Sequence, residues 1–448
     1  MGSLEDIASY VVNKGTEIGL DEVAALVSHR VYRQVRFSKN VITVTKVWDS
    51  VDVGILISKE KRIAKCTTGD PSGRSLSKAI ENLKSLANVM RPHESYTPLP
   101  KGPFRYATIR GIFDSRIPEL GDKCVDYAEG AINSALESGG KSVAGTLLAG
   151  DRTEVLETSS GVQASERRSS VSISVRSSVR VGGITLYGLG TSCGRTLSQF
   201  EPLKAGEESG RYASLSSRIV KTREGRYDAV FGRPALGNLL GYLSFMASAF
   251  YVDSGISFLE GRIGKRVGSN LITFLDDPTM DGGLGSRAFD MEGRPTQKTS
   301  IIDRGVLRTY LHNRLTATKF GAESTSNAGW VVPQPWNLYL APGTHEEEEL
   351  VESLRDGIFV NNATYTRFQN YRTGDFSSII RDGVFRIING EIAGAVHGLR
   401  LSDNLDRMLT ETLALSRASE QVMHWWMEVP VTTPNALLGN VGFTLPTA

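Results

Sequence analysis

The residues that most often bind zinc are few and widely spaced in this chain of 448 residues. Two histidines at close helical spacing, with a glutamate beside the first, form the usual catalytic zinc motif. Only His93 and His345 directly precede a glutamate, and neither has a second histidine within the next five residues. The six histidines are His29, His93, His312, His345, His397 and His424. Their spacing argues against a zinc site on one helix and leaves open only a site assembled from distant residues.

Cysteine chemistry has equally little support. The three cysteines, Cys66, Cys124 and Cys193, are odd in number and form no C-x-x-C pair. This spacing argues against a thiolate zinc site and against a disulfide framework. Unpaired, scattered cysteines are typical of a reducing compartment.

Carboxylates supply the remaining candidates for catalysis. Asp276, Asp277 and Asp375 would be the acid and base groups of an independent hydrolase. Aspartates in D-D-P and G-D-F sequences more often form turns and caps, however. The glycines of GGLGS, residues 282–286, precede no lysine and therefore do not match a phosphate-binding loop.

The composition restricts the classes of partner. Hydrophobic residues make up 40% of the chain and charged residues 22%, as in an ordinary globular protein. The 51 basic and 49 acidic residues nearly cancel, so no global charge favours nucleic acid or an anionic membrane. The most apolar stretch, residues 239–252, is shorter than the roughly 20 residues that a spanning helix needs. The first residues do not read as a signal peptide, so we expect a cytoplasmic protein without nucleic-acid or membrane partners.

The first half of the chain alternates between helical and strand patterns. Apolar residues at helical spacing predict helices at 4–20, 75–90 and 120–138. β-Branched enrichment predicts strands at 22–27, 31–36, 41–45 and 51–57, and more strands between 142 and 187. Residues 171–181 alternate cleanly between apolar and polar types, which predicts one buried and one solvated sheet face.

The second half is rich in glycine turns between short strands, with helices predicted only at 235–250 and 346–356. Thr344 and Glu347 have capping-box spacing, which gives the acidic run 346–349 a structural explanation. Asn389 and Gly390 form a strong hairpin signal. We therefore predict an α+β protein. Its N-terminal domain, residues 1–225, has an antiparallel sheet with helices, and its C-terminal domain, residues 226–448, is mostly β with few helices.

Several segments, in order along the chain, resemble the TldD/TldE (PmbA) family. The first is RQVRFSKNVITVTKVWDSVDVGILI, residues 33–57. A more specific run within residues 276–321 reads D-D-P, G-G-x-G-S, F-D-x-E-G-x-P-T and G-V-L-x-x-Y-L. STSNAG, PWNLYLAPG, NYRTGDFS and INGEIAGAVHGLRLSDNLDRML then follow. Each motif is weak alone, but their shared order from residue 33 to 409 makes the resemblance cover most of the chain.

This resemblance implies a degenerate metallopeptidase domain in the second half. The family's catalytic member, TldD, carries H-E-x-x-x-H on a helix and a later cysteine ligand. An approximate register on the helix beginning ALGNLLGYLSFM places Gly241 and Tyr242 at the His-Glu pair and Met246 at the second histidine. None of the three is a usual zinc ligand or a general base near neutral pH. No cysteine follows Cys193. The chain therefore resembles the TldE subunit, and we expect zinc only in a TldD-type partner.

Within the resembling segments, Asn327, Asn370, Asp375 and His397 are the candidates for contacts with a peptide or a cleft. His397 lies in the strand-like AVHGLRL segment, where a satisfied or surface histidine is the commoner case. The Trp425–Trp426 pair is predicted to pack either in the core or in a subunit contact.

Three functions follow as hypotheses. The resemblance implies a TldD–TldE heterodimer that digests peptides in an enclosed chamber, with this chain as its non-catalytic subunit, inactive as a peptidase alone. Such a subunit would present strand edges to an extended peptide. The alternative is a binding or regulatory homodimer that works without a peptidase, since family members have been called modulators of DNA gyrase. The third hypothesis is the independent hydrolase that uses the aspartates named above.

Overall fold

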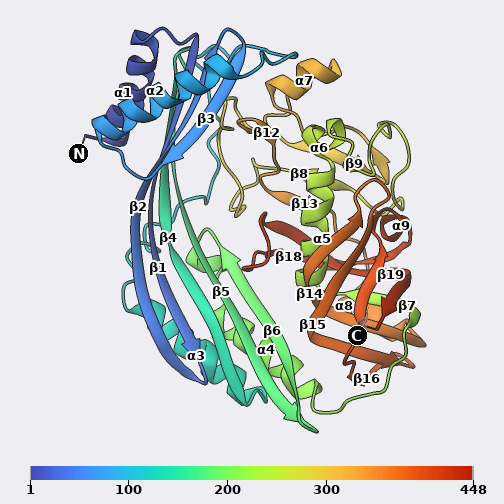
Figure 1. Ribbon diagram of the computed structural model, residues 1–448. Helices are drawn as coiled ribbons and strands as arrows, with labels where there is room; N and C mark the ends of the chain where they lie inside the picture. Colours follow the sequence, from blue (N-terminus) through green and yellow to red (C-terminus); the bar gives the residue numbers. More distant parts are fainter. Residues whose placement is uncertain (1, 446–448) are drawn as a thin grey trace.

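The computed structural model describes residues 2–445 and contains two large β-sheets (Figure 1). Helices make up 23% and strands 42% of the structure, which confirms the predicted α+β class. The N-terminal sheet is antiparallel, in the order β3-β2-β1-β4-β5-β6. Its strands are β1 (Glu22–Ser38), β2 (Val41–Lys59), β3 (Arg62–Thr68), β4 (Ser142–Thr158), β5 (Gln163–Val181) and β6 (Ile184–Gly194).

The strands of this sheet are longer than the sequence pattern predicts. Residues 22–27 and 31–36 belong to one strand, β1, which pairs with β2 without a break from Glu22 to Arg36. The polar residues between the two predicted strands do not end β1, because neither glycine nor proline interrupts it. The turn at Lys39 and Asn40, both with positive φ, then joins β1 to β2.

Four helices cover one face of the N-terminal sheet. They are α1 (Leu4–Glu17), α2 (Gly73–Val89), α3 (Lys123–Glu137) and α4 (Pro202–Leu215). Odd-numbered residues of β1, such as Val23, Val27 and Val35, are buried under these helices. Because side chains alternate along a strand, the even-numbered residues point to the opposite face. In Figure 1 α1 and α3 lie on the outer side of the sheet and the C-terminal half lies on its other side. α4 also packs against the C-terminal half, where Tyr212 stacks on Phe359 and Phe385.

The second half builds a mixed sheet of eleven strands with helices on its surface. The strands are β7 (Gly225–Phe231), β8 (Phe274–Asp276), β9 (Thr299–Asp303), β10 (Val306–Leu307), β13 (Leu338–Leu340), β14 (Asp356–Asn370), β15 (Asp375–Ile388), β16 (Glu391–Ala395), β17 (Arg400–Asn404), β18 (Thr412–Val422) and β19 (Val431–Thr444). β11 (Ala328–Gly329) and β12 (Val332–Pro333) form a separate pair. The helices are α5 (Arg233–Met246), α6 (Ala249–Asp253), α7 (Arg314–Phe320), α8 (Glu347–Glu352) and α9 (Leu405–Thr410). The mostly β character predicted for this half is thus confirmed.

Two local details test the sequence analysis. Asn389 and Gly390, both with positive φ, form the predicted hairpin turn between β15 and β16. The predicted cap of α8 is wrong. Glu346, not Thr344, is the N-cap, and the Glu349 side chain accepts a hydrogen bond from the Glu346 backbone N–H at 2.9 Å. The helix begins later than expected because residue 345 bridges to β18 and holds the chain extended.

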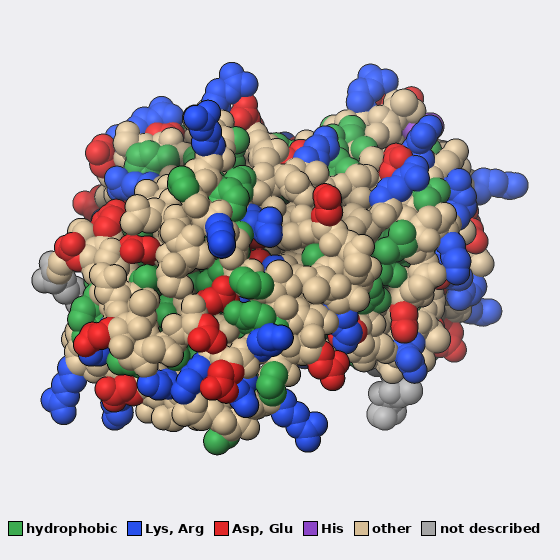
Figure 2. Space-filling view, turned by 90° about the horizontal axis from the view of Figure 1, so that it is seen from above, with side chains coloured by type: hydrophobic (Ala, Val, Ile, Leu, Met, Phe, Trp, Pro, Cys, Tyr) green, Lys and Arg blue, Asp and Glu red, His purple; other side chains and the backbone are tan. Residues whose placement is uncertain are grey.

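Acidic and basic side chains are mixed over the face of the molecule in Figure 2. None of the described helices is both long and apolar enough to cross a membrane. The sequence-predicted domain boundary, between residues 225 and 226, falls at the start of β7, the first strand of the second sheet.

Candidate functional site

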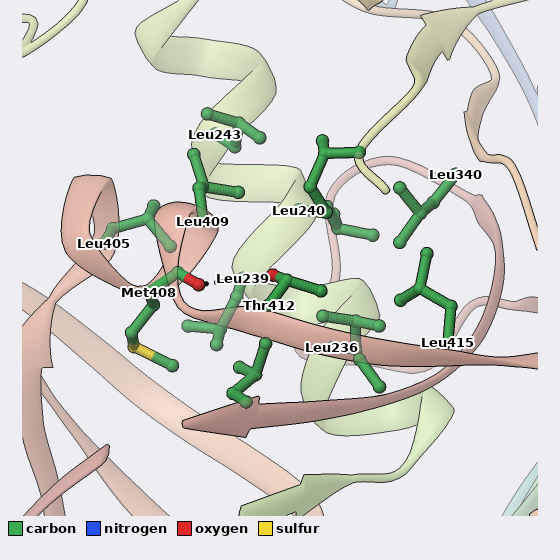
Figure 3. A pocket seen from close by; sticks show the side chains of 13 residues that line it. Leu236, Leu239, Leu240, Leu243, Leu340, Leu405, Met408, Leu409, Thr412 and Leu415 are labelled. Carbon is green, nitrogen blue, oxygen red and sulfur yellow. Dashed lines mark hydrogen bonds between the residues drawn. The ribbon is translucent and has the colours of Figure 1, made fainter. Parts of the chain in front are cut away.

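The apolar face of α5 sets the rotation of this helix. Leu236, Leu239, Leu240 and Leu243 point toward α9 and the neighbouring strands (Figure 3). The gap among them has a volume of about 20 Å³, room for about one water molecule. It is a small packing gap in the apolar core. Because the leucines are buried on this side, Gly241 and Tyr242 lie on the opposite face of α5.

The other face of α5 borders a larger cavity. Gly241, Tyr242 and Met246, the three positions at which the family resemblance expects zinc ligands and a general base, all line it. The cavity has a volume of about 360 Å³, and the segment from Trp426 to Val429 also lines it. The structure therefore brings these three sequence-predicted positions together at one wall.

The three side chains on this wall are poorly suited to metal chemistry. The Tyr242 hydroxyl donates to the Thr366 carbonyl at 3.2 Å, and burial raises the pKa of this tyrosine. Met246 is only 2% exposed and belongs to the hydrophobic core. A Cβ added to Gly241 would meet no heavy atom within 4 Å, so packing does not require glycine there. Across residues 2–445, no group of three or more histidine, cysteine or acidic side chains is placed to hold a metal ion.

Asn327 and Asp276 form a buried hydrogen-bonded network. The Asn327 side-chain amide donates to Asp276 at 2.5 Å and to the Gln334 carbonyl at 2.9 Å. The Asp276 carboxylate also accepts the backbone N–H groups of Trp336 and Asn337 at 3.0 and 2.7 Å. Burial raises the pKa of Asp276 to about 6. These bonds position the loop that carries Gln334 and Trp336, a structural role for both polar residues.

Asn370 and Asp375 close the hairpin between β14 and β15, where they are paired in register. The Asn370 side chain accepts the Arg372 N–H at 2.9 Å, and Asp375 accepts from Asn404 and Thr373. The hydrogen bond from Asn404, followed by that from Thr373, lowers the pKa of Asp375. Both residues are exposed, and so is His397, in the loop after β16. None of the three lines the cavities described here.

A second feature, which the sequence analysis missed, is a cleft between the N-terminal sheet and the C-terminal half. Two adjoining cavities form it, with volumes of about 460 and 770 Å³. Ser172 of β5 and Met423, which follows β18, line both cavities. We call this space the central cleft. The alternation in residues 171–181 predicts a polar sheet face that is solvated. In the structure this polar face lines the central cleft.

The tryptophan pair lies where the cavities meet. Trp425 is 71% exposed and lines the larger part of the central cleft, whereas Trp426 lines the cavity beside α5. The two rings are 4.1 Å apart between centroids, and Trp426 is equally close to the Tyr365 ring. Trp425 is therefore not a core residue, and the segment from Met423 to Val429 separates the two spaces.

Four arginines, Arg152, Arg168, Arg195 and Arg287, line the smaller part of the central cleft. Glu154 is ion-paired with the first two and with Arg287 at 3.2 Å. Although its burial opposes ionisation, these arginines lower the pKa of Glu154 to about 2. Burial, followed by the charge of Arg168, lowers the pKa of Arg195 to about 9. The arrangement gathers four arginines at one cavity, and three of them, Arg168, Arg195 and Arg287, are buried.

Comparison with known proteins places these features in a family. Residues 224–445 match the family model of the PmbA/TldA metallopeptidase C-terminal domain. A metalloprotease of Methanothermobacter thermautotrophicus is 34% identical over 48% of this chain and 49% of that protein. A PmbA-homologue metalloprotease of Haemophilus influenzae is 27% identical over 48% of this chain and 46% of that protein. The matches thus span about half the length of these metalloproteases.

Longer matches support the same relationship. An uncharacterized protein of Methanocaldococcus jannaschii is 27% identical over 83% of this chain and 88% of that protein. The crystal structure of TldE from Thermococcus kodakarensis has the same fold, with a TM-score of 0.86 and 20% identity, and covers 98% of this chain and 100% of that one. A Thermotoga maritima structure, described as that of a modulator of a DNA gyrase, has a TM-score of 0.86 and 22% identity over 99% of this chain and 100% of that one. Through residues 224–445, the chain belongs to the PmbA/TldD metallopeptidase family.

Proposed function

We propose that this chain is the non-catalytic, TldE-like subunit of a two-subunit zinc metallopeptidase that degrades or matures peptides. In this proposal a TldD-type partner supplies the zinc ion and the catalytic water. The observation that carries it is the wall of the cavity beside α5. Gly241, Tyr242 and Met246 occupy that wall in a metallopeptidase-family domain, and they offer neither a zinc ligand nor a general base near neutral pH.

The fold supports a role in holding peptide. β3 is an edge strand of the N-terminal sheet, and an extended peptide binds such an edge through backbone hydrogen bonds. The central cleft offers a second, polar surface between the two halves of the chain. A subunit of this kind encloses the substrate while its partner cleaves it. Since all three cysteines are free, we also propose that the complex works in the reducing cytoplasm.

Purification of this chain alone, and after co-expression with a TldD-type chain of the same organism, tests the proposal. We expect a heterodimer by mass determination, zinc content that follows the partner, and peptide hydrolysis only by the complex. A histidine-to-alanine change in the partner's H-E-x-x-x-H motif is the control, which abolishes hydrolysis while the complex still forms. Stoichiometric zinc and peptide hydrolysis in the lone chain would contradict the proposal.

The second candidate is a regulatory homodimer, which the gyrase-modulator description of the Thermotoga maritima structure favours. The same purification separates the two. A stable homodimer that ignores the TldD-type chain in a pull-down would support this second function and reject the first. Direct contact with DNA has no support in the charges, which sum to +2 for the whole chain.

A further inference from the structure

The floor of the central cleft is a row of side chains on one strand. Arg168, Ser170, Ser172, Ser174 and Arg176 alternate along β5 and line the cleft. At about 3.4 Å per residue in an antiparallel strand, the row is roughly 27 Å long, enough for seven or eight residues of an extended peptide. The small hydroxyl side chains leave room above the strand and offer hydrogen bonds to peptide groups.

One end of this row carries more positive charge than its carboxylates neutralise. Arg152, Arg168 and Arg287 share Glu154, and Arg168 also faces Glu166 at 3.2 Å. The remaining arginine of the four, Arg195, forms no ion pair among the described residues and donates only to backbone carbonyls, such as that of Ser169 at 2.9 Å. Glu428 also lines this part of the cleft, so four guanidinium groups face three carboxylates.

The cluster also has unused hydrogen-bonding capacity. The Nε atom of Arg152 is buried and has no acceptor within the described part of the chain. The Arg152 side chain is 34% exposed, whereas those of Arg168 and Arg287 are 8% and 6% exposed. A planar guanidinium group with free donors recognises a carboxylate through paired hydrogen bonds.

The surroundings distinguish this end from the other end of the row. Leu284, Trp336 and Val429 also line the part of the cleft that contains the arginines, and they suit an apolar side chain next to an anionic group. At the far end, Arg176 and Arg381 both contact the buried carboxylate of Asp382. Arg36 also lines the far end, so positive charge exceeds negative charge at both ends. Arg36 is exposed, however, whereas Arg168, Arg195 and Arg287 are buried. Buried guanidinium groups beside apolar walls are therefore a property of the Arg152 end.

We propose that the Arg152, Arg168, Arg195 and Arg287 cluster binds the C-terminal carboxylate of an extended peptide, whose preceding residues lie along the serine row of β5. The apolar walls select an apolar last residue. The inference rests on the proposed function for the identity of the ligand as a peptide. It adds which end of the peptide this subunit binds and the direction in which the peptide lies along β5.

Binding of a matched peptide pair to the full chain tests this site without any substitution. The probes are N-terminally fluorescein-labelled Ala-Ala-Ala-Leu with a free C-terminal carboxylate and the same peptide as a C-terminal amide. Fluorescence anisotropy at low salt should give a dissociation constant about tenfold or more lower for the free acid, because a charge-assisted bond is lost in the amide. Equal affinities for the two peptides would overturn the proposal.

Two variants locate the site. Arg152→Gln should abolish most of the preference for the free acid and leave amide binding unchanged. Arg74→Gln, an equal change of charge on an exposed residue of α2 on the opposite face of the sheet, should preserve the preference. Loss of the preference in both variants, or in neither, rejects the cluster as its source.

Inorganic phosphate is the competitor that separates a peptide end from another anion. Weak displacement of the free-acid peptide by phosphate agrees with the proposal, whereas phosphate binding tighter than the peptide overturns it. These readouts need neither zinc nor the partner chain. Selective binding of the free acid by a chain that forms no heterodimer would therefore reject the proposed function and leave this site intact.

Discussion

Arg176 of β5 donates from Nε to Oδ1 of Asp382 in β15 at 2.7 Å, which joins the two halves of the chain across 206 residues. The other oxygen of the carboxylate accepts from the Asn362 side chain at 3.0 Å. The Asp382 side chain is only 4% exposed, so its charge depends on these partners for solvation. The pair therefore links the N-terminal sheet to the C-terminal half at the far end of the central cleft.

Asp382→Asn should lower the free energy of unfolding by about 1–3 kcal/mol, because the charge-assisted bonds to the arginines are weakened in a buried position. Asparagine suits this test, since residue 382 has a φ of 60° and asparagine tolerates that conformation better than most residues. Urea unfolding followed by circular dichroism measures the change. Glu17→Gln, which alters a pair whose glutamate is 70% exposed, should leave the midpoint nearly unchanged.

Glu208 of α4 should make the stability of the protein fall as pH rises from about 4.5 to 7. Burial, followed by the charge of Glu420, raises the pKa of Glu208 to about 7 from the model-compound value of 4.5. The folded state then holds a proton that the unfolded state has released, so the free energy of unfolding decreases with pH in this window. Above it, the cost is on the order of 1–3 kcal/mol.

Glu208→Gln isolates this effect, because glutamine has nearly the same shape and does not titrate. Unfolding midpoints at a series of pH values should give a flatter profile for this variant, with its advantage over the parent increasing toward pH 7.5. Glu207→Gln, at the neighbouring exposed position, should reproduce the parent profile. Parallel profiles for the parent and Glu208→Gln would contradict the assignment.

The sequence predicted local structure well where one pattern governed a segment. The alternation in residues 171–181 is a strand with apolar residues on one face, and the Asn389–Gly390 turn is a hairpin. The length of β1 was not predictable in the same way. Its polar residues at 28–30 resemble a turn, but each has a polar partner on a neighbouring strand. Ser28 donates to Glu154 of β4 at 3.2 Å, and His29 and Arg30 contact Asp49 and Asp52 of β2.

The candidate site was predictable only in part, for a related reason. The register on α5 identified Gly241, Tyr242 and Met246, and the structure places all three on one cavity wall. Asn370, Asp375 and His397 lie in exposed turns instead, since short polar motifs specify hairpins as readily as binding sites. The arginine cluster combines β4, β5, the end of β6 and the loop at residue 287. No periodicity within one segment signals such a long-range assembly.

Two glycine substitutions should have opposite effects on stability. A Cβ at Gly190 of β6 would lie 2.0 Å from the Ala205 carbonyl oxygen of α4, a backbone atom that cannot move aside cheaply. Gly190→Ala should therefore destabilise the protein by about 1–3 kcal/mol. Gly241 lies inside α5 with open space around its Cβ position, so Gly241→Ala should stabilise the protein by about 0.5–1 kcal/mol through helix propensity. Thermal unfolding of both variants under identical conditions measures the contrast. A destabilised Gly241→Ala protein would contradict the open space beside Gly241. It would mean that packing excludes a larger side chain at this position.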